Sequence, residues 1–433
     1  MIRLYDFDEV KPEEILNRDI RAEADVEATV DAIIADVRAR GDAALLDYAA
    51  KFDHAQLTSV QVTQAEIDEA FAELEASDPE FITTLKMAAS NIRHFHEQQL
   101  HKNFVLNDRP GMVLGQKYTP IHRAGVYVPG GTAAYPSTVL MDVIPAKVAG
   151  VQQIVMTTPA GKDGKVNAGI LAAAVIAGID CIFKTGGAQA VAALAYGTES
   201  VPAVDKIVGP GNIYVATAKR KVFGKVGIDM IAGPSEILVL ADGTCSPAWV
   251  AADLLSQAEH DKLATPVLVT DSWDLAKAVQ AELEVQIPQL PRAAIARASV
   301  DTNGKIIVTD DMKKAIDAVN IIAPEHLEIC VDDPFAVLND IQNAGSIFLG
   351  KNVPEALGDY FAGPNHTLPT SGTARFSSPL GVDDFVKKSS FIYYTREALG
   401  EVQARIANFA EHEGLHAHAK SVTIRFEDEQ KGE

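Results

Sequence analysis

Short apolar segments that alternate with helical segments constrain the fold of this chain more than any other feature. Each apolar segment is rich in Val, Ile or Leu and short enough for a buried strand, whereas the segments between them have the apolar spacing of helices. The predicted strands are residues 154–158, 179–184, 206–208, 237–240, 267–270 and 306–309. The predicted helices include residues 167–177, 188–196, 213–222 and 247–259. This alternation is typical of right-handed βαβ units, so we expect an α/β protein with two Rossmann-like parallel-sheet domains.

Smaller appendages are expected at both ends of the chain. Residues 26–100 have helical spacing, and a strand at residues 125–128 ends in a glycine-rich turn. The last part combines apolar residues 391–394 with a helix at 399–410 and a strand-like segment at 421–426. We therefore predict an N-terminal appendage (1–22), a larger α/β domain (23–126 and 237–380), an inserted Rossmann-like domain (127–236) and a C-terminal appendage (381–433).

Charge and composition exclude several kinds of protein. The chain has 38 Lys and Arg against 59 Asp and Glu, a net charge of −21, which repels phosphate backbones and anionic lipids. We therefore expect no nucleic-acid partner and no membrane association, and no apolar run reaches the roughly 18 residues of a membrane span. Three cysteines are too few for a disulfide framework, and the N-terminus is acidic where a signal peptide would be basic. A cytoplasmic protein is expected.

Four glycine-rich joints accompany the predicted strands, at residues 129–131, 186–189, 209–212 and 233–236. Glycine at the carboxyl end of a parallel strand lets a ligand approach the backbone, and the helix that follows offers free N–H groups to an anion. Together the joints indicate a nucleotide site, although any one glycine could simply end a strand. The usual dinucleotide fingerprint is incomplete because Tyr214 stands where its third glycine belongs, so NAD would bind in a non-standard way.

Polar side chains in three segments are candidates for metal binding and acid–base chemistry. Gln257 and His260 project from one helix face and could hold a metal, or could be an exposed helix end. Glu325 and His326 lie in a turn that begins with proline and suit general acid–base work, although such pairs are often on the surface. Residues 411–418 gather three histidines and two acids, which could be a solvated helix end. Histidine, aspartate and glutamine together would suit zinc.

Taken together, seven motifs make the sequence resemble the histidinol dehydrogenase family over essentially its whole length. They are Tyr-Val-Pro-Gly-Gly (127–131), Gly-Gly-Ala-Gln-Ala (186–190), Lys-Ile-Val-Gly-Pro-Gly-Asn (206–212), Ala-Gly-Pro-Ser-Glu (232–236), Asp-Leu-Leu-Ser-Gln-Ala-Glu-His (253–260), Pro-Glu-His-Leu (324–327) and Gly-Asp-Tyr (358–360). Each motif is weak alone, but their common order and spacing identify the family.

The resemblance implies an activity, two cofactors and a set of site residues. The family oxidises L-histidinol to L-histidine through histidinal, the last step of histidine biosynthesis, with NAD and one zinc ion per site. By motif, the zinc ligands would be Gln257, His260, Asp359 and His418, and the catalytic residues Glu325 and His326. The expected substrate contacts are Ser235, Gln257, His260, His326, Asp359, His366, Glu413 and His418, and the expected NAD contacts are Tyr127, Gln189 and Asn212. A homodimer is also implied, in which the C-terminal appendage contributes to the partner's active site.

Residue chemistry favours one route from alcohol to acid. His326 is the expected base for the hydroxyl proton because its ordinary pKa lies near neutrality. None of the three cysteines has an evident activating partner, so we expect the aldehyde to be hydrated, with Glu325 activating water. Two other readings stay open. One is a dehydrogenase of the same fold for another amino alcohol or a sulfonate-bearing diol, and the other is a catalytically silent paralogue.

Overall fold

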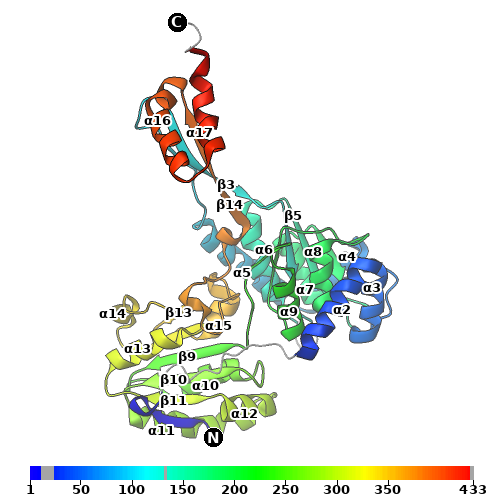
Figure 1. Ribbon diagram of the computed structural model, residues 1–433. Coiled ribbons are helices and arrows are strands. Elements are labelled where there is room, and N and C mark those ends of the chain that lie inside the picture. The colour runs from blue at the N-terminus through cyan, green and yellow to red at the C-terminus, as the bar shows by residue number, and fades with distance from the viewer. Residues whose placement is uncertain (11–23, 131–133, 430–433) are drawn as a thin grey trace. The chain divides into compact units, whose positions relative to one another are not determined.

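The computed structural model describes residues 1–10, 24–130 and 134–429 (Figure 1). Two compact units divide the chain. One contains residues 1–100 and 121–385, and the other contains residues 101–120 and 386–433. Part of the predicted N-terminal appendage and Gly131 of the first glycine-rich joint lie outside the described residues. The larger unit holds both parallel sheets, and the smaller unit holds an antiparallel one.

A five-stranded parallel sheet occupies residues 123–228. Its strands are β4 (Arg123–Tyr127), β5 (Gln153–Thr158), β6 (Cys181–Lys184), β7 (Lys206–Val208) and β8 (Gly227–Ile228), in the order β6-β5-β4-β7-β8. Its helices are α6 (Pro136–Ala149), α7 (Ala168–Ala177), α8 (Gly187–Tyr196) and α9 (Ile213–Val222). The strand order reverses between β4 and β7, which is the topological switch point where Rossmann-like sheets bind ligands at their carboxyl ends.

Local sequence signals explain where these helices begin and end. The Asn167 side chain accepts hydrogen bonds from the first turn of α7, and Asn212 does the same for α9. Gly178 ends α7 in the left-handed region at φ 82°, where a side chain would be strained. The predicted helix at 213–222 is confirmed with the same bounds, and the predicted strand at 206–208 matches β7.

The N-terminal helices belong to the packing of this first sheet. They are α2 (Ala24–Arg40), α3 (Asp42–Tyr48), α4 (Gln64–Ser77) and α5 (Pro79–Glu97), with a π-helical turn at Ala49–Asp53. Val30 and Ile33 of α2 share one buried core with Val191 and Leu194 of α8, while α4 packs on α7 and α5 on α6. This packing differs from the grouping of residues 23–126 with 237–380 in the sequence analysis, whose domain boundaries stay a prediction.

A six-stranded parallel sheet forms the rest of the larger unit. Its strands are β1 (Arg3–Asp6), β9 (Glu236–Ala241), β10 (Thr265–Thr270), β11 (Lys305–Val308), β12 (His326–Cys330) and β13 (Ser346–Leu349), in the order β1-β11-β10-β9-β12-β13. The helices are α10 (Pro247–Ala258), α11 (Trp273–Gln286), α12 (Ala293–Thr302), α13 (Met312–Ile322), α14 (Pro334–Leu338) and α15 (Glu355–Leu357), followed by a π-helical turn at Gly358–Ala362. Two parallel-sheet layers therefore confirm the predicted α/β fold class.

The two faces of the second sheet are covered by different helices. Helices α10, α11 and α12 contribute to the buried core on one face, and α13 contributes to the core on the other. Strand β1 pairs with β11, so the first residues of the chain belong to this sheet although about 300 residues separate the two strands. No helix in the described part of the chain is long and apolar enough to cross a membrane.

The smaller unit is antiparallel. Strand β3 (Met112–Pro120) pairs with β2 (Phe104–Leu106) and with β14 (Val386–Tyr394), and helices α16 (Arg396–His412) and α17 (His416–Thr423) follow. The predicted strand at residues 421–426 is wrong because this segment continues α17 and then forms a 3-10 helix, Ile424–Glu429. The Phe426 ring lies 4.8 Å from the Arg396 guanidinium at the start of α16, so its apolar side chain packs on a helix and not in a sheet.

Candidate active site

The predicted catalytic pair lies at the amino ends of β9 and β12. Ala323 ends α13 in a left-handed conformation (φ 50°), and the chain then passes through Glu325 into β12, of which His326 is the first residue. His326 is in register with Ile237, near the start of β9. The pair is therefore held at a strand entrance and is not part of an exposed turn: Glu325 is 7% exposed and His326 is 3% exposed.

One ring nitrogen of His326 forms a hydrogen bond with the backbone, and the other is available to accept a proton. Nδ1 lies 2.9 Å from the carbonyl oxygen of Glu236, which can only accept, so Nδ1 carries the hydrogen. Nε2 is buried without a hydrogen-bond partner among the described residues and lies 3.6 Å from both Glu355 Oε1 and Asp359 Oδ1. Burial lowers the pKa of His326, but Glu355, Glu325 and Asp359 outweigh burial and raise it well above its ordinary range.

Glu325 is a second buried ionisable group beside the ring. Its Oε2 accepts a hydrogen bond from the Glu236 amide at 2.8 Å and lies 3.7 Å from His326 Nδ1. Burial raises the pKa of Glu325 to about 8, against the opposing effect of His326. The backbone of Glu236 thus holds both members of the pair, one through its amide and the other through its carbonyl.

Three of the four predicted zinc ligands are brought to this same region. Gln257 is in the last turn of α10 and His260 follows two residues after the helix, while Asp359 lies in the π-helical turn after α15. The oxygen Oε1 of Gln257 and Nδ1 of His260 are both buried without a hydrogen-bond partner among the described residues. Burial raises the pKa of Asp359, but contact with His326 outweighs burial and lowers it, which favours the carboxylate.

The unpaired Gln257 oxygen and His260 nitrogen are suitable ligand atoms for a divalent metal ion. Leaving a buried amide oxygen and imidazole nitrogen unpaired costs free energy, and a metal would satisfy both. Amide oxygen, imidazole nitrogen and carboxylate are ligands that zinc accepts. His326, Glu355 and Asp359 form a further group whose ligand atoms lie within 4.8 Å of one another. The donor set therefore suits the ion that the sequence resemblance implies.

Glu355 was not identified from the sequence, although it lies at the centre of the site. Its carboxylate accepts hydrogen bonds from the Gln257 amide and, at 3.0 Å, from the Ser256 hydroxyl. This bond fixes the Gln257 amide so that its nitrogen faces Glu355 and its oxygen stays free. Burial raises the pKa of Glu355 to about 7. The available signal was its position four residues before Asp359 in a helical segment, which places both acids on one face.

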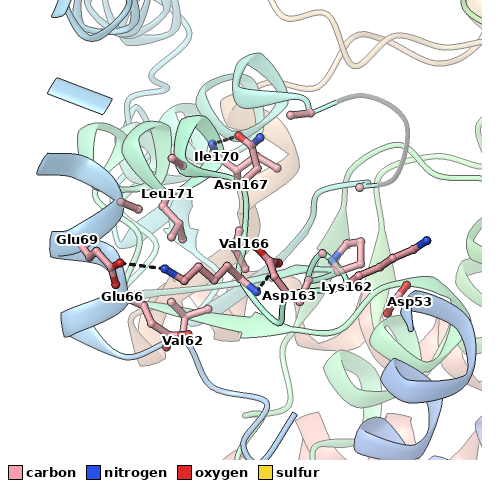
Figure 2. Close-up of a pocket in the computed structure, with 18 of the residues that line it drawn as sticks. Asp53, Val62, Glu66, Glu69, Lys162, Asp163, Val166, Asn167, Ile170 and Leu171 are labelled. Atoms are coloured by element: carbon pink, nitrogen blue, oxygen red, sulfur yellow. Dashed lines mark hydrogen bonds and ion pairs between the residues drawn. The ribbon is translucent and has the colours of Figure 1, made fainter. Parts of the chain in front are cut away.

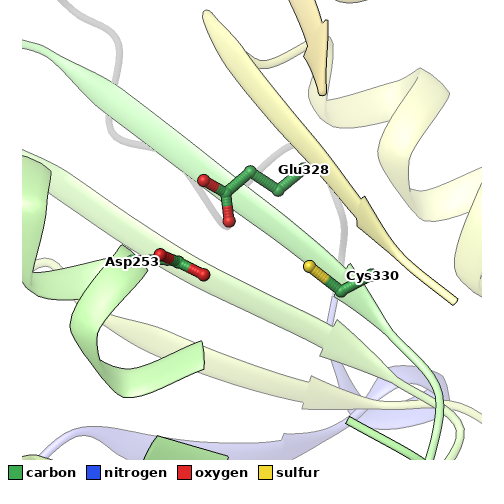
Figure 3. A group of neighbouring side chains, drawn as sticks. All are labelled: Asp253, Glu328 and Cys330. Carbon is green, nitrogen blue, oxygen red and sulfur yellow. The ribbon is translucent and has the colours of Figure 1, made fainter. Parts of the chain in front are cut away.

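Two further acids, Glu328 and Asp253, lie close to Cys330 (Figure 3). Glu328 of β12 accepts a hydrogen bond from the Glu355 amide at 2.7 Å, and it forms a close group with Asp253 and Cys330. Burial raises the pKa of Glu328 to about 9, with the nearby Asp253 acting in the same direction. Through its hydrogen bond to the amide, Glu328 holds the backbone of Glu355.

The other predicted substrate contacts are distributed over both units. Ser235 directly precedes Glu236, and His366 Nε2 lies 3.3 Å from the hydroxyl of Thr138 on α6. Glu413 and His418 belong to the smaller unit, where both side chains are exposed. The roles of these four residues stay predictions.

The predicted NAD contacts lie at the carboxyl ends of strands in the first sheet. Tyr127 ends β4, and its hydroxyl accepts a hydrogen bond from the Gly187 amide at 3.1 Å. Gln189 is buried in the first turn of α8, and Asn212 caps α9 directly after the joint that follows β7. Burial raises the pKa of Tyr127 to about 12, so its hydroxyl stays protonated. These positions surround the switch point where Rossmann-like sheets bind nucleotides.

A cavity of about 980 Å³ lies at the same edge of the sheet (Figure 2). Gly130 and Pro159, which follow β4 and β5, line it together with Asp53 and residues of α4 and α7. Asp53 Oδ2 is buried without a hydrogen-bond partner among the described residues, and burial raises its pKa to about 6. A cavity of this size can hold a drug-sized ligand or larger.

Comparison with known proteins agrees with the motifs. The family model for histidinol dehydrogenase matches residues 16–426. The histidinol dehydrogenase of Listeria monocytogenes serovar 1/2a is 53% identical over 421 residues, 97% of each chain, and that of Bacillus subtilis is 57% identical over 397 residues, 92% of each chain. A crystal structure of histidinol dehydrogenase from Elizabethkingia anophelis superposes with a TM-score of 0.94 at 38% identity, over 99% of both chains. The chain therefore belongs to the histidinol dehydrogenase family and is an enzyme.

Proposed function

We propose that this enzyme oxidises L-histidinol to L-histidine through histidinal, in two successive NAD-dependent steps that complete histidine biosynthesis. The observation that carries the proposal is the buried His326, whose unpartnered Nε2 lies 3.6 Å from Asp359, in a site that also contains the free donor atoms of Gln257 and His260. A base beside a potential metal site suits the oxidation of an alcohol that also carries metal-binding nitrogens.

One zinc ion per site is part of the proposal. Gln257, His260 and Asp359 would hold it, with His418 of the partner subunit as the fourth ligand. When bound, zinc would hold the imidazole and amine of the substrate and so orient its carbinol carbon. Glu355 supports this arrangement because it holds the Gln257 amide nitrogen and leaves the amide oxygen available.

NAD is the proposed hydride acceptor, held by Tyr127, Gln189 and Asn212. Their positions at the carboxyl ends of β4, β6 and β7 suit a dinucleotide, since the amino end of α8 has no side-chain cap and its partial positive charge favours phosphate.

Proton movements are assigned to the catalytic pair. His326 in its neutral form takes the hydroxyl proton at Nε2, because the Glu236 carbonyl keeps the other proton on Nδ1. A zinc ion held beside the ring would favour the neutral form, since its charge would offset the carboxylates that raise the pKa of His326. In the second oxidation Glu325 activates water for attack on the aldehyde, and His326 takes the proton of the hydrate.

A covalent thiol route is not supported by the environment of the cysteines. Burial raises the pKa of Cys181 to about 11. Contact with Cys330 lowers the pKa of Cys245, but this thiol donates a hydrogen bond to the Cys330 carbonyl at the far end of β12 from His326. Contact with Cys245 and burial raise the pKa of Cys330 itself, which opposes thiolate formation. Hydration of the aldehyde is therefore the preferred route.

A homodimer with shared sites is proposed for the assembly, with Glu413 pairing with the substrate ammonium. Both Glu413 and His418 are exposed on the smaller unit, as residues that serve a partner's site need to be. Activity that falls on dilution in step with dissociation of a dimer would support this assembly. A fully active monomer would contradict it.

The stoichiometry of the reaction is the direct test. A limiting amount of L-histidinol is incubated with excess NAD, and the NADH formed is counted by absorbance. Two NADH per histidinol support the proposed function. One NADH would indicate an ordinary alcohol dehydrogenase, and none would favour a silent paralogue.

A further inference from the structure

Three hydrogen bonds fasten the segment 365–367 to helix α6. The Asn365 side-chain amide donates to the Met141 carbonyl at 2.6 Å, and the Thr367 hydroxyl donates to Asp142 Oδ1 at 2.8 Å. Between them, His366 Nε2 lies 3.3 Å from the Thr138 hydroxyl. Positions 138, 141 and 142 of α6 are three and four residues apart, so all three contacts come from one helix face.

These contacts are almost completely removed from solvent. Thr138 is 2% exposed, Asn365 is 4% exposed and Asp142 has no exposed surface. The segment also has an internal hydrogen bond, from the Thr367 amide to Asn365 Oδ1 at 2.9 Å. Buried hydrogen bonds of this kind restrict both backbone and side chain, so residue 366 has little freedom to rotate.

The ring of His366 is therefore held between two parts of the chain. Thr138 contacts Nε2, and the backbone of Asp359 forms a hydrogen bond with the same ring. These two contacts, one from α6 and one from the segment that holds Asp359, fix the orientation of the ring.

We propose that helix α6 orients His366 for the substrate, and that Thr138 and Thr367 are positioning residues for the oxidation of histidinol. The inference rests on the proposed function, in which His366 contacts the substrate. The proposal assigns a role in substrate binding to Thr138 of α6, the helix that follows β4 of the five-stranded sheet.

The test uses paired substitutions in the full-length enzyme. Thr138→Val keeps the shape of the side chain but removes its oxygen, whereas Thr138→Ser keeps the hydroxyl. Thr217→Val, at a buried threonine of α9, is the matched control for removing a helical hydroxyl. The KM values for L-histidinol and NAD, kcat and the thermal midpoint are measured for each, with calorimetric binding of L-histidinol in the absence of NAD.

We expect Thr138→Val to raise the KM and dissociation constant for L-histidinol roughly five- to tenfold, the effect of one lost hydrogen bond. The KM for NAD should stay within about twofold, and Thr138→Ser and Thr217→Val should resemble the wild type. If Thr138→Val does not fold, Thr367→Val provides the same test through the contact with Asp142.

Two results would overturn the proposal. One is unchanged histidinol binding in both Thr138→Val and Thr367→Val. The other is an equal rise in the KM for NAD and for histidinol together with a lower thermal midpoint, which would mark Thr138 as a purely structural residue. Failure of the proposed function is distinct, because the wild-type enzyme would then not oxidise histidinol.

Discussion

Replacing Asp142 by Asn should change how the stability of this enzyme depends on pH. Asp142 has no exposed surface, its Oδ1 accepts the Thr367 hydroxyl, and its Oδ2 has no hydrogen-bond partner among the described residues. Burial raises its pKa from the ordinary 3.8 to about 8, and the nearby Asp229 adds to the rise while Lys219 opposes it. The folded protein therefore keeps this carboxyl protonated where the unfolded chain would ionise it.

The size of the effect follows from proton linkage. Between about pH 4 and about pH 8 the folded state binds one more proton at Asp142 than the unfolded state, so the free energy of unfolding falls as pH rises. The slope is about 1.4 kcal/mol per pH unit, and the total is at most about 6 kcal/mol. Asp142→Asn keeps the acceptor for Thr367 and removes the titration. Its stability relative to the wild type should rise by up to about 3 kcal/mol from pH 5 to pH 7.

Urea unfolding at pH 5, 6 and 7 and constant ionic strength measures this difference. The amide nitrogen that replaces Oδ2 has no partner, which costs roughly 1–3 kcal/mol of stability at every pH. The test therefore uses the pH dependence of the stability difference between Asp142→Asn and wild type, and not its size at one pH. Asp317→Asn, at an exposed aspartate on α13, is the control and should show no slope. A constant difference between Asp142→Asn and wild type over this range would refute a protonated Asp142.

Three further outcomes are expected. Glu325→Gln should reduce histidinal oxidation by about 100-fold or more and histidinol oxidation less, since only the aldehyde step needs activated water; equal activity on both substrates would exclude this role for Glu325. Removing the metal with a chelator should abolish turnover and added zinc should restore it, and full activity in enzyme shown to be metal-free by elemental analysis would exclude a catalytic requirement. Gly209→Ala should lower the thermal midpoint by several degrees, because the residue has φ 114° and its added Cβ would lie 2.1 Å from the Tyr127 carbonyl oxygen; an unchanged midpoint would show that the joint adapts.

Sequence patterns were most informative where structure is local. The strand at 206–208 and the helix at 213–222 have strong signals of their own, an apolar β-branched run and an Asn cap. The strand prediction at 421–426 was wrong because Val422, Ile424 and Phe426 alternate with polar residues as in a strand. In the structure Phe426 packs against Arg396 of a helix. Tertiary packing decided its structure, and a local pattern cannot represent that.

Pairings between strands that are far apart in the chain could not be predicted from local patterns either. Nothing near Arg3 indicates that it pairs with Lys305, and nothing near Met112 indicates that it pairs with Tyr394. The motif of Glu325 and His326, by contrast, was visible in the sequence, whereas Glu355 was missed because a lone acid in a helical segment resembles a surface residue. Only the fold shows that it is 2% exposed and bonded to Gln257.

Glu325 and His326 lie at the amino ends of β9 and β12, and this position determines the polarity of the electrostatic field around them. In a parallel α/β sheet this edge receives the carboxyl ends of the helices, such as the last turn of α10 that carries Gln257. Helix carboxyl ends carry a partial negative charge, and with the Asp359 carboxylate they make this edge favourable for a dication and an ammonium group. In the five-stranded sheet, the candidate NAD residues lie instead at the carboxyl edge. This edge receives the amino ends of α8 and α9, whose partial positive charge favours phosphate. One fold thus provides two edges of opposite polarity, each matched to the charge of its expected ligand.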